Sequence, residues 1–137
     1  MSRIEEQLIV DEGLKLKPYP CTAGKLTIGV GRNLDDRGIT KEEALYLLRN
    51  DIKEVGLDVS SNLPWFASLC PARQDVLVNM AFNLGIEGLL KFKNTLKHVQ
   101  AGEYDLAATG MLESKWAGQV GARASRLAQM MRTGEYL

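Results

Sequence analysis

The hydrophobic pattern at the start of the chain predicts a short amphipathic helix that ends just before Gly13. Its apolar positions, which follow a helical period, are Ile4, Leu8 and Ile9. Ser2 and Glu5 form a capping box at its start, and Gly13 can end it in the left-handed conformation of a Schellman motif. Asp11 and Glu12 then lie at the negative end of the helix dipole, where acidic side chains are unfavourable. We therefore infer a purpose for these acids other than helix stability.

After Gly13 the period of the apolar positions changes from helical to two, which predicts strands. Pro18 and Pro20 interrupt the first extended run, so it is expected at a sheet edge. A turn over residues 22–25 includes Gly24, which can adopt a positive φ. In the next run, Leu26, Ile28 and Val30 alternate with Thr27, Gly29 and Gly31. This run predicts a strand with one apolar face and one nearly bare face, which favours close approach of a ligand or another backbone.

From Thr40 onward the pattern is helical. Thr40 and Glu43 form a second capping box, which opens a helix expected to run to about Val55. Gly56 and residues 60–64 break the pattern, which we interpret as the junction between two lobes. The helices predicted beyond it cover Pro71 to a stop at Gly85, Asn94–Ala101, Tyr104–Glu113 and Ala122–Arg132. The first of these is apolar on most sides and is expected to be the central core helix. The fold class is therefore α+β and mostly helical.

Composition excludes several classes of function. The 137 residues carry seventeen basic and seventeen acidic side chains, so the chain lacks the basic surface of a nucleic-acid-binding protein. Cys21 and Cys70 do not make a disulfide framework, and a single His98 gives no metal-ligand spacing, so we expect no metal and no cofactor. The first residues are too polar for a signal peptide, and no apolar run is long enough to span a membrane. These features predict a protein that is made and kept in a cytoplasm.

Two segments carry a resemblance to a known family. Residues 12–19 and 24–31 resemble the active-site segment of the T4-type phage lysozymes, the endolysins of glycoside hydrolase family 24. Further matching segments follow in the same order along nearly the whole chain: 38–44, 79–85, 92–96, 114–116, 123–126 and 132–134. The resemblance implies one domain over 1–137 with two lobes around a cleft. The small α+β lobe would comprise 13–59, with an inter-lobe helix at its end, and the helical lobe 1–12 and 60–137.

The resemblance also implies a function and a set of site residues. It implies a muramidase that hydrolyses the β-1,4 bond between N-acetylmuramic acid and N-acetylglucosamine in peptidoglycan, with inversion at the reacting carbon. Glu12 matches the acid that protonates the leaving oxygen, and Thr27 matches the threonine that positions the attacking water. Arg123 matches an arginine that pairs with the catalytic glutamate. The residues expected to contact the glycan strand are Gly29, Gly31, Asn83, Phe92 and Asn94.

The chain departs from the family pattern at three places. Cys21 stands where the family has an aspartate, and Arg32 stands where it has a histidine. Arg32 is expected to form a salt bridge with Asp51, which matches the usual partner of that histidine. A segment that the family carries after Asn33 is missing, so the small lobe should be smaller.

Cys21 leaves the mechanism open. As a thiolate base or a hydrogen-bond partner beside Thr27, it would serve the attacking water and preserve an inverting muramidase. If it does not, Glu12 alone would drive a lytic transglycosylase, in which a hydroxyl of the sugar closes a 1,6-anhydro ring. A covalent role for the sulfur is the least favoured option for this residue. A different class is a peptidoglycan-binding protein that has lost hydrolysis, and a more remote one is a helical adaptor without a glycan ligand.

The resemblance implies a biological setting as well. Similar endolysins accumulate in the host cytoplasm and reach the cell wall when a holin opens the inner membrane. We therefore expect the glycan strand of peptidoglycan as the ligand, a holin as a functional partner without direct contact, and a monomer.

Overall fold

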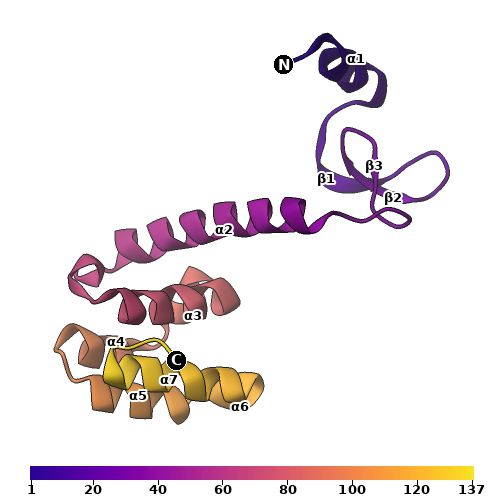
Figure 1. Ribbon diagram of the computed structural model, residues 1–137. Coiled ribbons are helices and arrows are strands. Elements are labelled where there is room, and N and C mark those ends of the chain that lie inside the picture. Colours follow the sequence, from indigo (N-terminus) through magenta and orange to yellow (C-terminus); the bar gives the residue numbers. More distant parts are fainter. The chain divides into compact units, whose positions relative to one another are not determined.

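The computed structural model describes residues 1–137 and contains seven α-helices, a short 3-10 helix and three strands (Figure 1). The chain divides into two compact units, Met1–Leu47 and Leu48–Leu137, which we call the sheet unit and the helical unit. The predicted α+β, mostly helical class is confirmed. The predicted assignment of residues 1–12 to the helical lobe stays a prediction.

The first element, α1 (Arg3–Glu12), begins as the sequence predicted and ends differently in detail. The Ser2 hydroxyl accepts from the amide of Glu5, and the Glu5 carboxylate accepts from the amide of Ser2, so the capping box is confirmed. Gly13 has the predicted positive φ of 79°, but its ψ of 162° is extended, so no Schellman motif forms. The Gly13 amide still donates to the carbonyl of Ile9 at 2.8 Å. This geometry needs a glycine and directs the chain straight into the first strand.

The three strands form one antiparallel sheet in the order β1 (Lys15–Pro20), β2 (Leu26–Gly29), β3 (Arg32–Asn33). As predicted, β1 lies at an edge of the sheet, a position that tolerates its two prolines. Tyr19 pairs with Thr27, and the register shifts between Lys15 and Tyr19. The turn before β2 places Gly24 at a φ of 77°, as predicted.

The predicted alternation of β2 continues only to Gly29. Gly29 and Gly31 both adopt positive φ, at 69° and 68°, so the chain turns there instead of continuing the pleat. Val30 and Gly31 belong to this turn, and β3 follows directly. The prediction of one strand face containing Thr27, Gly29 and Gly31 is therefore wrong beyond Gly29, because these glycines supply turn conformations that other residues rarely adopt.

The long helix α2 (Lys41–Asn62) begins at the predicted capping box of Thr40 and Glu43. It does not stop near Val55 but continues through Gly56, so that part of the prediction is wrong, whereas its end at Asn62 lies within the predicted break over residues 60–64. One glycine in a helix costs only about 1 kcal/mol relative to alanine. Val59, one turn further on, is completely buried in the core of the helical unit, and this packing outweighs that cost.

The helical unit contains the end of α2, the 3-10 helix and five further α-helices. Their bounds are η1 (Phe66–Ser68), α3 (Pro71–Leu90), α4 (Lys93–Gln100), α5 (Tyr104–Leu112), α6 (Lys115–Val120) and α7 (Ala122–Thr133). Gly85 breaks α3 with φ 76° and ψ 161°, which confirms the predicted stop, but a helical segment after it was not predicted. The sequence interpretation also missed α6, which Ser114 caps by accepting from the Ala117 amide.

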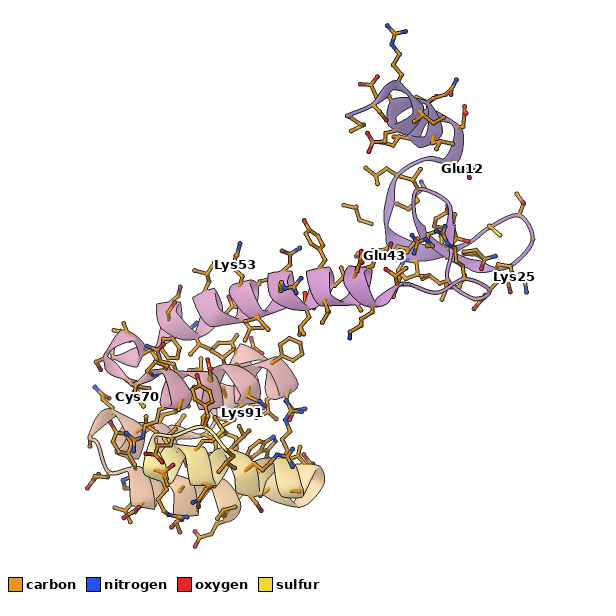
Figure 2. The ribbon with its side chains drawn as sticks, in the orientation of Figure 1. Glu12, Lys25, Glu43, Lys53, Cys70 and Lys91 are labelled. Atoms are coloured by element: carbon orange, nitrogen blue, oxygen red, sulfur yellow. The ribbon has the colours of Figure 1, made fainter.

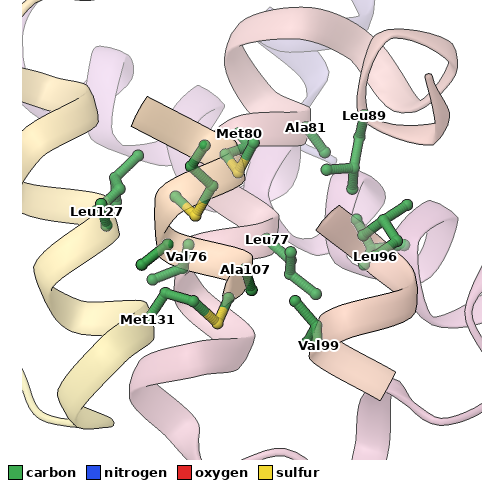
Figure 3. Packing of buried hydrophobic residues seen from close by; sticks show 14 of the residues in the cluster. Val76, Leu77, Met80, Ala81, Leu89, Leu96, Val99, Ala107, Leu127 and Met131 are labelled. Atoms are coloured by element: carbon green, nitrogen blue, oxygen red, sulfur yellow. The ribbon is translucent and has the colours of Figure 1, made fainter. Parts of the chain in front are cut away.

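The hydrophobic core belongs to the helical unit, where α5 packs against α4 and α7, and α3 packs against α7 (Figure 3). The side chains that α3 contributes are Val76, Leu77, Met80, Ala81 and Leu89, which confirms this helix as central to the core. Leu96, Val99, Ala107, Leu127 and Met131 meet them from the other helices. No helix of the chain is both long enough and apolar enough to cross a lipid bilayer.

Candidate active site

Glu12 and Gly31 lie against each other within the sheet unit. Glu12 is the last residue of α1, and its side chain is exposed (Figure 2). A Cβ added to Gly31 would lie 2.7 Å from Glu12 Oε2 and 3.1 Å from its carboxyl carbon. The carboxyl group therefore occupies the space that a side chain at Gly31 would take. The acid that the sequence indicated is accessible and faces a backbone without a side chain.

Cys21 and Thr27 meet at the turn between β1 and β2. The Cys21 amide donates to the Lys25 carbonyl at 2.9 Å, and the Gly24 amide donates to the Cys21 carbonyl at 2.8 Å. Hydrogen bonds from the backbone amides of Lys25 and Ala23 lower the pKa of the Cys21 thiol. The turn therefore favours the thiolate form of Cys21 more than the surroundings of an ordinary exposed cysteine would.

Thr27 is the most buried residue of the sheet unit, with 3% of its surface exposed. It lies on the central strand, between Tyr19 on β1 and Asn33 on β3. Its hydroxyl donates to the Lys25 carbonyl at 2.9 Å. A hydroxyl has one hydrogen and two acceptor lone pairs, so this bond leaves the oxygen able to accept from a water. Its predicted role with water stays a prediction.

Arg32 is paired differently from the prediction. Its Nη1 and Nη2 donate to the two carboxylate oxygens of Glu43 at 2.8 and 2.7 Å, and Nη1 also donates to the Gly38 carbonyl at 3.1 Å. The expected bridge to Asp51 is wrong, because Asp51 lies eight residues, or about 12 Å, further along α2 than Glu43. Arg32 and the Thr40 amide lower the pKa of Glu43 to about 2.

Asn83 and Phe92, two of the predicted glycan contacts, share one neighbour in the helical unit. The indole N–H of Trp116 donates to Asn83 Oδ1 at 2.8 Å. The Phe92 and Trp116 rings meet edge to face with centroids 6.0 Å apart. Phe92 also lines a groove together with Asn94 and His98. These contacts hold the side chains in place, and their contact with a glycan stays a prediction.

Arg123 is held by Asn79, a residue to which the sequence interpretation gave no role. Nε and Nη2 of Arg123 donate to Asn79 Oδ1 at 2.9 and 2.8 Å. Both residues line a pocket of the helical unit together with Arg126 and Tyr136. The pairing of Arg123 with Glu12 stays a prediction, since Glu12 belongs to the sheet unit.

Comparisons with known proteins agree with the resemblance seen in the sequence. The chain matches the family model for phage lysozyme over residues 10–133. It is 31% identical to the pre-baseplate central spike protein Gp5 of Enterobacteria phage T4; the match covers 94% of this chain and 27% of that protein, so the chain spans about a quarter of it. "Probable T4-type lysozyme 1" of Dictyostelium discoideum is 28% identical over 98% of this chain and 96% of its own length.

A phage protein gives a similar result. The "Endolysin" of Acyrthosiphon pisum secondary endosymbiont phage 1 is 32% identical over 77% of this chain and 71% of its own length. The family model spans most of the chain and includes the three residues that the turn and the end of α1 present, namely Glu12, Cys21 and Thr27. The chain therefore belongs to the phage lysozyme family.

Proposed function

We propose that this peptidoglycan-lysing lysozyme hydrolyses the β-1,4 bond between N-acetylmuramic acid and N-acetylglucosamine with inversion. The observation that carries the proposal is the exposed carboxyl of Glu12 against Gly31, in one compact unit with Cys21 and Thr27. Inverting glycosidases need an acid for the leaving oxygen and a base for a water on the opposite face of the sugar. Glu12 supplies the acid, and Cys21 with Thr27 supplies the water-binding pair.

In the proposed reaction, Glu12 transfers its proton to the glycosidic oxygen while the bond from that oxygen to C1 breaks. A water attacks C1 from the opposite face, so the configuration inverts. The Cys21 thiolate takes the proton that this water loses. Exchange with solvent then restores the proton on Glu12 and removes it from Cys21.

The turn around Cys21 supports the proposal that its thiolate acts as the general base. Its thiol has a lowered pKa, chiefly because the backbone amides of Lys25 and Ala23 donate to it. The Thr27 oxygen, whose hydrogen points to the Lys25 carbonyl, has lone pairs free to accept from the attacking water. Arg123 is proposed to pair with Glu12 and orient its carboxyl group.

The second candidate is a lytic transglycosylase, and the cysteine in place of a carboxylate is the observation that favours it. In that reaction the C6 hydroxyl of the muramic acid attacks its own C1, and the product carries a 1,6-anhydro ring. Glu12 alone would carry the proton transfers. A protein that binds peptidoglycan without cleaving it is the remaining candidate.

Activity and product analysis test the proposal. Wild type should reduce the turbidity of outer-membrane-permeabilised cells and Glu12→Gln should not, whereas equal inactivity of both would favour the binding protein. Products with a free reducing end of inverted configuration would support hydrolysis. Products with 1,6-anhydro ends would show that the reaction is transglycosylation instead. Cys21→Asp should retain activity and Cys21→Ser should lose it. Full activity of Cys21→Ser would show that the sulfur of Cys21 takes no part in the reaction.

The biological setting is proposed from the family alone. We propose that the glycan strand of peptidoglycan is the ligand, that a holin releases the enzyme from the host cytoplasm to the cell wall, and that the enzyme acts as a monomer.

A further inference from the structure

One peptide group of the sheet unit contacts both residues of the proposed water-binding pair. The carbonyl oxygen of Lys25, in the turn between β1 and β2, accepts from the Cys21 amide at 2.9 Å (Figure 2). The same oxygen accepts from the Thr27 hydroxyl at 2.9 Å. The position of this oxygen therefore determines where the hydrogen of the Thr27 hydroxyl points and where the backbone of Cys21 lies.

The other end of the same peptide group is held by Asp35. The Lys25 carbonyl and the Leu26 amide form one rigid plane, and the Leu26 amide donates to Asp35 Oδ2 at 2.6 Å. The peptide bond is trans, so its N–H and C=O point in opposite directions. A carboxylate on the N–H fixes this plane and, as a charged acceptor, polarises the group so that its carbonyl becomes a stronger acceptor.

Asp35 takes the place of a backbone carbonyl that the sheet does not supply. β3 ends at Asn33, and the next residue, Leu34, donates its amide to the Leu26 carbonyl at 2.7 Å. Two residues that form a hydrogen-bonded antiparallel pair would exchange a second bond, from the Leu26 amide to the Leu34 carbonyl. That carbonyl instead accepts from the Gly38 amide at 3.1 Å. The Leu26 amide is therefore left for the side chain of Asp35.

The neighbouring Asp36 contacts the same turn in a different way. Its carboxylate accepts from Lys25 Nζ at 3.2 Å and from Asn33 Nδ2 at 3.0 Å. The side chains of Lys25 and Asp36 are 46% and 59% exposed, and ion pairs this exposed add little to stability. Asp36 thus carries the same charge on the same loop and reaches the side chain of Lys25, but not its peptide group.

We propose that Asp35 is a positioning residue for the reaction: its carboxylate fixes the peptide group between Lys25 and Leu26, whose carbonyl oxygen sets Cys21 and Thr27 for the attacking water. This inference rests on the proposed function, which assigns the water to Cys21 and Thr27. Asp35 does not touch the substrate in this proposal and acts only through the backbone.

The kinetic test compares two substitutions of Asp35 with one of Asp36. Asp35→Ala removes the hydrogen bond and the charge, whereas Asp35→Asn removes only the charge, because its amide oxygen still accepts. Asp36→Ala removes an equal charge from the same loop. On a soluble peptidoglycan fragment, Asp35→Ala should lower kcat about tenfold with KM unchanged. Asp35→Asn should recover most of this loss, and Asp36→Ala should keep kcat within about twofold of wild type.

Hydrogen exchange of the Cys21 amide, measured by NMR, tests the same contact without catalysis. This amide donates to the Lys25 carbonyl, so it should exchange several-fold faster in Asp35→Ala than in Asp35→Asn. The Gly13 amide, which donates to the Ile9 carbonyl at the end of α1, is the internal reference and should not change. Wild-type kcat in Asp35→Ala, or equal losses of kcat in Asp35→Ala and Asp36→Ala, would overturn the proposal. Equally faster exchange of both amides would also overturn it, because it would indicate general loosening of the sheet unit.

The two proposals fail in distinguishable ways. If Glu12→Gln remains active or Cys21→Ser is fully active, the proposed function fails, and the role of Asp35 in the reaction falls with it. If Glu12→Gln and Cys21→Ser are both inactive while Asp35→Ala keeps the wild-type kcat, only the role of Asp35 is wrong.

Discussion

At Gly31 the missing side chain makes room for the proposed acid. A Cβ there would lie 2.7 Å from Glu12 Oε2, and the φ of 68° is unfavourable for any residue with a side chain. Gly31→Ala should therefore lower the free energy of unfolding by about 1–2 kcal/mol. It should also displace the Glu12 carboxyl and reduce the lysis rate at least about tenfold. Thermal unfolding and a turbidity assay measure the two effects.

Gly38→Ala separates these two effects. Gly38 has nearly the same φ, 65°, but the nearest atom to an added Cβ is the Leu34 carbonyl oxygen at 4.0 Å. This variant should lose similar stability without touching Glu12, so its lysis rate should remain close to wild type. Equal losses of activity in Gly31→Ala and Gly38→Ala would mean that backbone strain, and not the displacement of Glu12, explains the result.

The individual residues of the site could be predicted from the sequence to different degrees. Glu12 stood out because two acids at the end of a helix oppose its dipole, which is a local property. The close approach at Gly31 was expected in kind, but from a strand, whereas the structure forms a turn there. The partner of Arg32 could not be predicted, because the choice between Glu43 and Asp51 depends on how β3 meets the start of α2.

At the scale of elements, the pair of Arg32 and Glu43 ties β3 to the first turn of α2. The pKa of Glu43 is lowered from 4.5 to about 2, chiefly by Arg32. A lowered pKa means that the pair stabilises the folded state fully above pH 4.5 and loses this effect as the pH falls towards 2. Wild type should therefore be more stable than Glu43→Gln at pH 7, and the difference should shrink between pH 4.5 and 2.

Hydrogen exchange of the amides in β3 and in the first turn of α2 measures this difference locally. Glu42→Gln is a suitable control, because Glu42 lies on the same helical turn and makes no ion pair within the chain. A stability difference between wild type and Glu43→Gln that stays constant down to pH 2 would show that the ionised pair does not stabilise the fold.

Two helical glycines should respond to alanine in opposite directions. At Gly56 an added Cβ would meet no atom within 4 Å, so Gly56→Ala should stabilise the protein by about 1 kcal/mol. At Gly88 the Cβ would lie 2.7 Å from Leu84 Cβ, so Gly88→Ala should destabilise it. Thermal unfolding should show a rise of a few degrees for the first variant and a fall for the second. A fall for Gly56→Ala would mean that this glycine relieves strain in α2.

The contrast between local interactions and tertiary packing explains which elements could be predicted from the sequence. The starts of α1 and α2 were predicted because a capping box needs only residues three apart. The course of α2 past Gly56 was not, because the burial of Val59 decides it and depends on distant helices. Gly85 does break α3, since its positive φ ends a helix whatever the surroundings. Local chemistry could be interpreted from the sequence, whereas tertiary packing could not.

At the scale of the whole molecule, the two units contribute unequally to burial. All the buried apolar side chains, from Val59 to Met131, belong to the helical unit, and Thr27 is the one buried residue of the sheet unit. Buried apolar surface is the main source of folding free energy. The proposed acid and water-binding residues therefore lie in the unit that buries less, while Arg123 lies in the unit with the core.

This distribution predicts unequal protection against hydrogen exchange. Amides of α3, α5 and α7 should open only with global unfolding, whereas amides of β1 and β2 should open at a cost lower by a few kcal/mol. Leu77→Ala, which creates a cavity in the core, should destabilise the helical unit by about 2–5 kcal/mol and bring the exchange of its amides closer to that of the strands. The exchange of β2 amides should change less. Equal protection in both units of the wild type, falling equally in Leu77→Ala, would mean that they unfold as one cooperative body.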